Sequence, residues 1–236
     1  GIFEAKVIAA HCVHVDTGEM RTLLHAGAGV AHNPSSNLKL ASGFAPVVKM
    51  LETGLNVGIG TDGPASNNDL DMFEEVRLAS FVAKAASNDP TVLPAAAALT
   101  MATRLGAKAL HLGDITGSLE VGKRADLILV DTNPLHNTPR FKRDPLNAYA
   151  QLVYASKSTD VTDVMVDGKW LMRDHKLLTI QEKELIAQAR ELAVKIDAFE
   201  KRRATGKLRS IASFDNVTKP WVAREGLDGD VHGALR

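Results

Sequence analysis

The chain has 236 residues, with 28 basic and 28 acidic side chains, so its formal charge is zero when histidine is neutral. That balance argues against a nucleic-acid binder, which needs excess Lys and Arg to neutralise phosphates. Cys12 is the only cysteine, which excludes an intrachain disulfide and a thiolate metal cluster. No apolar run approaches the roughly 18–20 residues that cross a bilayer, and the N-terminal residues lack the basic start of a secretory signal. We therefore expect a cytoplasmic protein that binds neither nucleic acid nor membrane.

Three short apolar runs in the first part of the chain have the pattern of buried strands. They lie at 6–10, 28–31 and 55–59. A continuous apolar run of this length is typical of a parallel strand, which is buried on both faces. The runs therefore predict three neighbouring strands of one parallel sheet.

Helical patterns separate and follow these runs, at 17–26, 44–54, 70–87 and 91–110. Gly54 is placed to end the second helix. Asn67, Asn68 or Asp69 is placed to cap the third. The alternation of strands with helices predicts right-handed βαβ units and an α/β fold.

The pattern changes after His111, where long helices no longer separate the strands. Two runs indicate strands, 125–131 and 161–172, and turns are expected at Gly117, Gly122 and Asp167-Gly168. A helix is predicted over 181–204 from its apolar spacing, and the tail after Gly206 is expected to be extended or partly disordered. We therefore divide the chain into three parts: a partial barrel at 1–112, a partial β-sandwich at 113–180, and a C-terminal helix with its tail at 181–236.

Three polar side chains follow the three predicted strands. His11, His32 and Asp62 are separated by 21 and 30 residues. A (β/α)₈ barrel of about 250 residues uses roughly 31 residues for each βα unit, and its chemistry lies at the C-terminal ends of its strands. Imidazole and carboxylate groups suit a divalent metal and an activated water, although a lone histidine at a strand end is often only structural. The spacing therefore predicts that the three side chains face one shared mouth.

Several long motifs resemble a known family. These are AAHCVHV at 9–15, AHNPSSNLKLASGFAPV at 31–47, GTDGPASNNDLDMFEEVRLAS at 60–80, GSLEVGKRADLILVD at 117–131 and VTDVMVDGKWLM at 161–172. They resemble the amidohydrolase superfamily and, within it, the branch of 5-methylthioadenosine/S-adenosylhomocysteine deaminases. The resemblance implies the C-terminal half of a (β/α)₈ barrel, with about three βα units, followed by part of a small β-sandwich. It also implies a metal-activated water, with zinc or iron as the metal, that deaminates an adenosine-like purine.

The resemblance also implies roles for individual residues. Asp62 matches the carboxylate at the end of the eighth strand, which binds the metal and shuttles a proton. His11 matches the histidine of the sixth strand, which contacts the attacking water; it would become a metal ligand only in a rebuilt site. Substrate-pocket candidates are His32, Asn33, Ser36, Asn37, Ser66 and Asn67. His14 is expected to support the site, and Cys12 to pack beneath it.

The sequence departs from the family because the motifs that supply the other metal ligands and the catalytic glutamate do not occur in it. The inward face of the three strands would then meet water. At about 25 cal/mol per Å², a few hundred Å² of such surface costs several kcal/mol. We therefore expect the chain to be covered by another copy of itself or by a complementary N-terminal chain, and not to be a stable monomer.

Two other hypotheses fit the same residues. A truncated, repurposed hydrolase could use His11, His32 and Asp62 on activated esters or lactones. A degenerate half-barrel could instead be a non-catalytic binding or oligomerisation module. Metal content and hydrolytic turnover distinguish these hypotheses from each other and from a deaminase.

Overall fold

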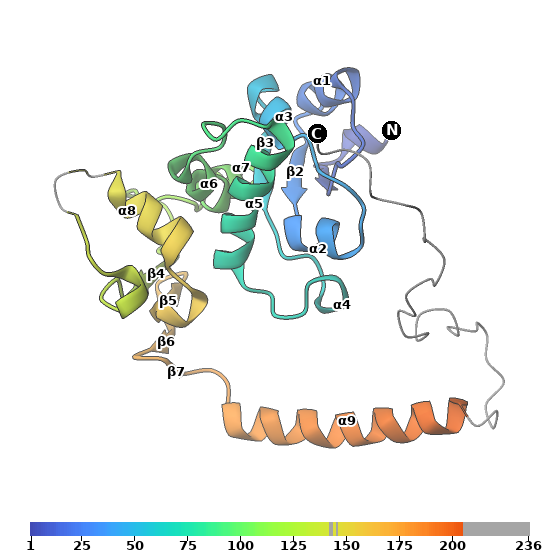
Figure 1. Cartoon of the computed structure of the whole chain (residues 1–236), viewed down its shortest axis with the longest axis vertical. Helices are drawn as coiled ribbons and strands as arrows, with labels where there is room; N and C mark the ends of the chain where they lie inside the picture. The colour runs from blue at the N-terminus through green and yellow to red at the C-terminus, as the bar shows by residue number, and fades with distance from the viewer. Residues whose placement is uncertain (142–143, 145, 205–236) are drawn as a thin grey trace, which may run out of the picture. The chain divides into compact units, whose positions relative to one another are not determined.

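The computed structural model describes residues 1–141, 144 and 146–204 (Figure 1). Residues 1–180 form one compact unit, and a second unit begins at Gln181. Of the second unit, the structure describes the single helix α9, Glu182–Ala204. The tail after Gly206, which we expected to be extended or partly disordered, lies outside the described residues.

A three-stranded parallel sheet lies at the centre of the first 110 residues. Its order is β1-β2-β3, with β1 at Ile8–Ala10, β2 at Gly29–His32 and β3 at Asn56–Ile59. β1 and β3 fall within the predicted runs, and β2 extends one residue beyond its run, to His32. The expectation that each is buried on both faces is wrong for β1, since Ile8 is 46% exposed. Among the described residues β1 pairs with β2 alone, so it forms an outer edge of the sheet.

Helices of several lengths surround this sheet, at α1 Thr17–His25, α2 Pro34–Lys39, α3 Val47–Thr53, α4 Pro64–Asn67, α5 Met72–Ser87, α6 Ala95–Ala102 and α7 Arg104–Ala109. Gly54 ends α3 in the left-handed conformation, as predicted. The cap of α5 is Asp71, whose carboxylate accepts hydrogen bonds from Phe73 and Glu74; the three predicted caps are wrong. The helix predicted over 91–110 is two helices, because the backbone leaves the helical region at Thr103.

The core lies on one face of the sheet, and α7 closes part of the other. Val30 and Val57 are fully buried in a cluster that includes Met50 and Val76. On the opposite face, a Cβ at Gly29 would collide with the carbonyl group of Ala109 in α7. The glycine therefore lets the helix backbone rest directly on the strand. This contact covers part of the face of the sheet that lies opposite the core.

A second sheet follows after residue 126 and is antiparallel, with the order β4-β5-β6-β7. Its strands are β4 Leu127–Val130, β5 Val161–Val166, β6 Lys169–Arg173 and β7 Lys176–Leu177. The predicted turns are confirmed by positive φ angles at Gly117, Gly122 and Gly168. Shorter helical segments lie at η1 Ile2–Glu4, η2 Leu135–Asn137, α8 Asn147–Ala150, η3 Gln151–Ala155 and η4 Ser158–Asp160.

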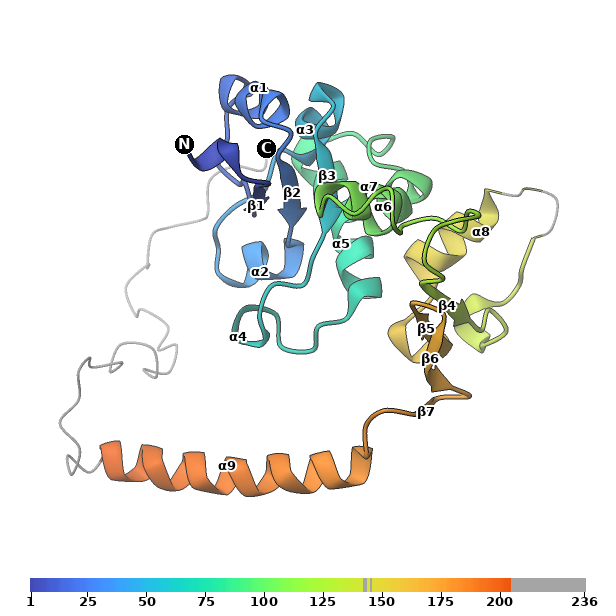
Figure 2. The same cartoon turned by 180° about the vertical axis from the view of Figure 1, so that it is seen from behind.

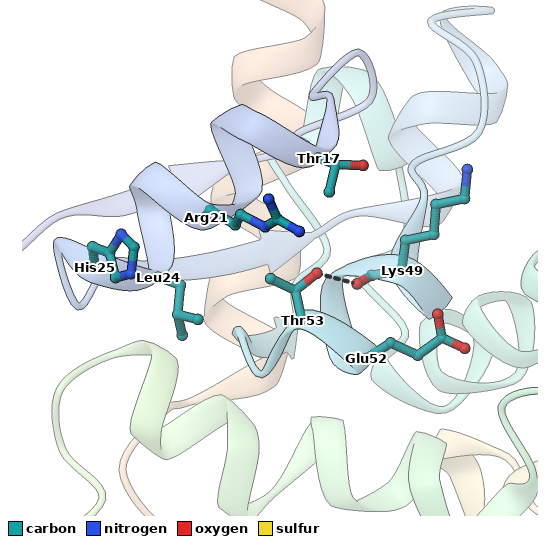
Figure 3. Close-up of a pocket in the computed structure, with 7 residues that line it drawn as sticks. All are labelled: Thr17, Arg21, Leu24, His25, Lys49, Glu52 and Thr53. Atoms are coloured by element: carbon teal, nitrogen blue, oxygen red, sulfur yellow. Dashed lines mark hydrogen bonds between the residues drawn. The ribbon is translucent and has the colours of Figure 1, made fainter.

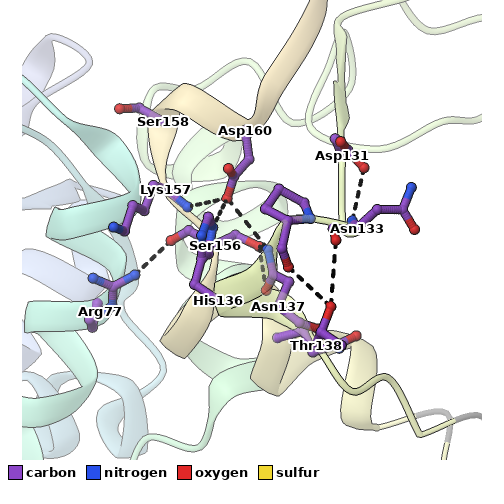
Figure 4. Close-up of polar contacts among 12 residues, drawn as sticks. Arg77, Asp131, Asn133, His136, Asn137, Thr138, Ser156, Lys157, Ser158 and Asp160 are labelled. Atoms are coloured by element: carbon purple, nitrogen blue, oxygen red, sulfur yellow. Dashed lines mark hydrogen bonds and ion pairs between the residues drawn. The ribbon is translucent and has the colours of Figure 1, made fainter.

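A polar cluster joins α5 to the segment that precedes β5 (Figure 4). The Arg77 guanidinium donates to the carbonyl oxygens of Val153 and Ser156, at 3.3 and 2.6 Å. The Ser158 hydroxyl donates to Asp71, the N-cap of α5, at 2.7 Å. These bonds fix the start and the second turn of α5, the helix that borders the site described next.

No helix among the described residues is both long and apolar enough to cross a membrane.

Candidate active site

The C-terminal ends of the three parallel strands point toward α2 and α4 (Figures 1 and 2). His11 directly follows β1, and Asp62 follows β3 after two residues. Both lie in the left-handed backbone region, with φ of 65° and 60°. Non-glycine residues rarely adopt this region, and they cluster at functional sites when they do. The turns bring the His11 Nε2 atom to 3.7 Å from the Asp62 Oδ2 atom.

Two serine hydroxyls hold the Asp62 carboxylate. Ser36 of α2 and Ser66 of α4 both donate to Oδ2, at 2.7 and 2.8 Å. These two bonds, then a backbone bond from Gly63, lower the pKa of Asp62 to about 2. Hydrogen bonds to the charged form of an acid favour that form. Asp62 is therefore an anion throughout the neutral pH range.

Asn37 fixes the orientation of the His11 ring. The His11 Nδ1 atom lies 2.8 Å from the Asn37 Oδ1 atom. An amide oxygen only accepts, so Nδ1 carries the hydrogen in the neutral ring. The Nε2 atom, which faces Asp62, is then left with its lone pair. His11 can accept or share a proton at that atom.

The two side chains open into a cavity of about 460 Å³, lined by His11, Val13, His14, Ser36, Leu40, Ser42 and Asp62. His11 and Asp62 are about one-third exposed, at 38% and 34% of their side-chain surfaces. A larger pocket of about 620 Å³ lies between α1 and α3 and contains none of these residues (Figure 3). The side chains that line that pocket come from α1 and α3 and not from the residues that follow the strands.

The remaining predicted residues lie around the pair. His32, Asn33 and Asn37 are buried, whereas Ser66 and Asn67 are half-buried in α4. Cys12 is half-buried, and burial raises the pKa of its thiol, which disfavours a thiolate. The structure thus brings His11 and Asp62 together, whereas His32 is buried and does not line the cavity, so the prediction that all three face one mouth is wrong for His32.

The described residues do not by themselves form a complete metal site. Among the residues that the structure describes, no group of three or more His, Cys, Asp or Glu side chains could hold a metal. A zinc site normally takes at least three protein ligands. Asp62 fits one ligand position, because it is an anion at the mouth of the cavity.

Glu75 of α5 was not predicted as part of the site. It is buried, and its two carboxylate oxygens contact α2 and α4. The available signal was its position on the apolar face of α5, four residues before the buried Ala79. A charge on such a face needs polar partners.

Burial of His32 makes the stability of the fold depend on pH. The pKa of His32 is lowered from 6.5 to about 4, first by burial and then by the nearby charge of His11. The unfolded chain therefore binds a proton below about pH 6.5, whereas the folded chain does not until about pH 4. As the pH falls from 6.5 to 4, each unit of decrease should lower the free energy of unfolding by up to about 1.4 kcal/mol.

Urea unfolding at several pH values tests this prediction. His32→Gln should flatten the slope between pH 6.5 and 4, whereas His25→Gln, at an exposed position on α1, should leave it unchanged. An identical slope in His32→Gln would show that the histidine does not stay neutral in the folded chain.

Comparison with known proteins identifies the family. Residues 1–171 match the model of the amidohydrolase family, and the chain belongs to that family. The chain is 51% identical over 193 residues to a 5-methylthioadenosine/S-adenosylhomocysteine deaminase of Desulforudis audaxviator, covering 82% of this chain and 44% of the relative. It is 48% identical over 198 residues to a 5'-deoxyadenosine deaminase of Methanosarcina acetivorans, covering 84% and 44%.

Solved structures show the same relationship. An adenosine deaminase from Xanthomonas campestris with bound zinc superimposes with a TM-score of 0.76 at 43% identity, covering 81% of this chain and 42% of that one. The atrazine chlorohydrolase of Arthrobacter aurescens, in complex with zinc, gives 0.71 at 28% identity, covering 79% and 40%. The chain thus spans less than half the length of the relatives it matches.

Proposed function

We propose that this chain carries the water-activating part of a metal-dependent hydrolase that deaminates an adenosine-like purine. The observation that carries the proposal is the pair at the strand ends: an Asp62 carboxylate held ionised by two hydroxyls, beside a His11 ring oriented by Asn37. The deaminases among the relatives support the reaction class.

The proposal includes an architecture. β1, β2 and β3 would be three strands of an eight-stranded barrel, and β4–β7 would be part of a small β-sandwich. The boundaries would be those of the sequence prediction, at 1–112, 113–180 and 181–236. In its support, the outer edges of β1 and β3 have no neighbouring strand among the described residues. Residues of another copy or of a complementary chain would continue the sheet on both sides.

The metal would be zinc, with iron as the alternative, and Asp62 would supply one of its ligands. The zinc in the Xanthomonas campestris relative supports this choice. A bound divalent cation would supply Lewis acidity, which lowers the pKa of a water molecule. The other ligands would come from residues beyond those described.

The chain's own residues would move the protons. The Asp62 carboxylate would accept a proton from the attacking water, and the lone pair on His11 Nε2 would orient that water. The water oxygen adds to the ring carbon that carries the amino group. The C–N bond then breaks, and Asp62 returns the proton to the leaving ammonia. Ser36 and Ser66, with His32, Asn33, Asn37 and Asn67 around them, would shape the substrate side of the cavity.

Ammonia release by the purified, metal-loaded protein tests the proposal. When the residues that supply the other ligands are present, we expect turnover of adenosine-like purines, accompanied by about one equivalent of zinc or iron. Asp69→Asn, at an exposed position between α4 and α5, should behave as the wild type does. Turnover of esters or lactones alone would favour a repurposed hydrolase. Absence of both metal and turnover would favour a non-catalytic binding module.

A further inference from the structure

The buried carboxylate of Glu75 lies between the two short helices that hold Asp62. Glu75 is 1% exposed. Its Oε2 atom accepts the backbone N–H of Ser35 at 3.1 Å, at the start of α2. Its Oε1 atom accepts the side-chain amide of Asn67 at 2.6 Å, at the end of α4. Each oxygen therefore holds a different segment of the site.

Each partner of Glu75 is adjacent in sequence to a hydroxyl that holds Asp62. Ser35 precedes Ser36, and Asn67 follows Ser66. Both hydroxyls converge on the same Asp62 Oδ2 atom from segments that are 30 residues apart. The distance between the two hydroxyls thus depends on how α2 and α4 are held relative to each other.

Neither helix is long enough to set that distance alone. α2 has six residues and α4 has four, and neither has a side-chain bond at its N-cap. Helices this short are marginal without tertiary contacts. α5, by contrast, has 16 residues, is capped by Asp71, and is anchored by Arg77. α5 is therefore the longer, anchored helix to which both segments are bonded.

The desolvation of Glu75 indicates that its position serves a purpose beyond stability. Among the described residues Glu75 forms no ion pair, and burial raises its pKa while the bonds from Ser35 and Asn67 oppose that effect. A buried carboxylate without a cation is costly, and an apolar side chain would fill the same place on α5 at lower cost. An apolar side chain could not hold the two segments.

We propose that Glu75 is a positioning residue, which holds Ser36 and Ser66 at the distance from each other at which both donate to Asp62. The two hydroxyls then move as one unit with α5. The proposal rests on the proposed function for its effect on catalysis, but the coupling of the two segments does not depend on it.

Hydrogen exchange of the full-length protein, measured by mass spectrometry, tests the coupling without any assay of activity. In Glu75→Gln one oxygen becomes a donor that faces another donor, so the peptides covering 33–40 and 61–68 should both lose protection, by about 10-fold or more. The sheet strands should keep theirs. Glu74→Gln, at the exposed neighbouring position, is the control. Loss in one segment only, or loss across the whole fold, would overturn the proposal.

A double variant that exchanges the donor and acceptor of the bond between residues 75 and 67 should restore that bond. In the double variant Glu75→Gln with Asn67→Asp, the glutamine amide can donate to the new carboxylate while its oxygen still accepts from Ser35. Protection of both segments should return to within about 3-fold of the wild type. If the enzyme is a deaminase, Glu75→Gln should lower kcat more than it changes KM. If the double variant has the wild-type melting temperature but protection of the two segments does not return, the positioning role is refuted. Absence of activity in every variant would refute only the proposed function.

Discussion

Asp62→Asn should abolish turnover by the metal-loaded enzyme and remove its metal, while the fold stays intact. The amide has the shape of the carboxylate, and its oxygen can still accept the hydroxyls of Ser36 and Ser66. It has neither the charge that binds a cation nor the basicity that accepts a proton. We expect a loss of at least about 10²–10⁴-fold in kcat, the scale of a lost acid–base group.

Metal analysis, steady-state kinetics and a thermal melt together check this result. Because the pKa of Asp62 is about 2, the wild-type side chain is ionised across the neutral range. The difference between wild type and variant should therefore not change between pH 6 and 8, a range chosen well above that pKa. Undiminished turnover by the Asp62→Asn protein would end the metal-hydrolase hypothesis.

His11→Ala should lower kcat by about 10²–10⁴-fold and leave the metal content unchanged. The reason is that His11 is held by Asn37 and offers Nε2 to the cavity, so it orients the water without binding the cation. Its loss removes one polar group from the reaction and keeps Asp62 with both serines. Metal analysis beside the kinetics separates the two roles.

His25→Ala, at an exposed position on α1, is the matched control and should retain wild-type kcat. Loss of metal together with kcat in His11→Ala would show that His11 has become a ligand. That outcome would favour a rebuilt site and a repurposed hydrolase.

The strands and their polar ends were predictable because they depend on local pattern. Parallel strands are short apolar runs, and their carboxyl ends meet at one edge of the sheet. That argument alone predicted the proximity of His11 and Asp62, which lie 3.7 Å apart. The cap of α5 was predicted wrongly because the loop before it offers several capping residues in succession, and the pattern does not select among them.

The network around Asp62 was harder to predict. α2 and α4 are too short to show helical periodicity, so the convergence of Ser36 and Ser66 on one oxygen depends on tertiary contacts. The buried position of Glu75 likewise depends on which face of α5 meets the sheet. The orientation of His11 depends on a left-handed turn at a non-glycine residue, for which the sequence carries no signal.

The bonds that anchor α5 have a consequence for how the protein is made. Arg77 and Asp71 bind partners that lie 76, 79 and 87 residues further along the chain. At a synthesis rate of about 5–20 residues per second, those partners leave the ribosome roughly 4–17 seconds after α5. During that interval α5 must keep its place through its apolar face and the bonds of Glu75 to Ser35 and Asn67. The anchoring of α5, on which the support of Asp62 depends, is therefore completed late in biosynthesis, after the segment that precedes β5 has been made.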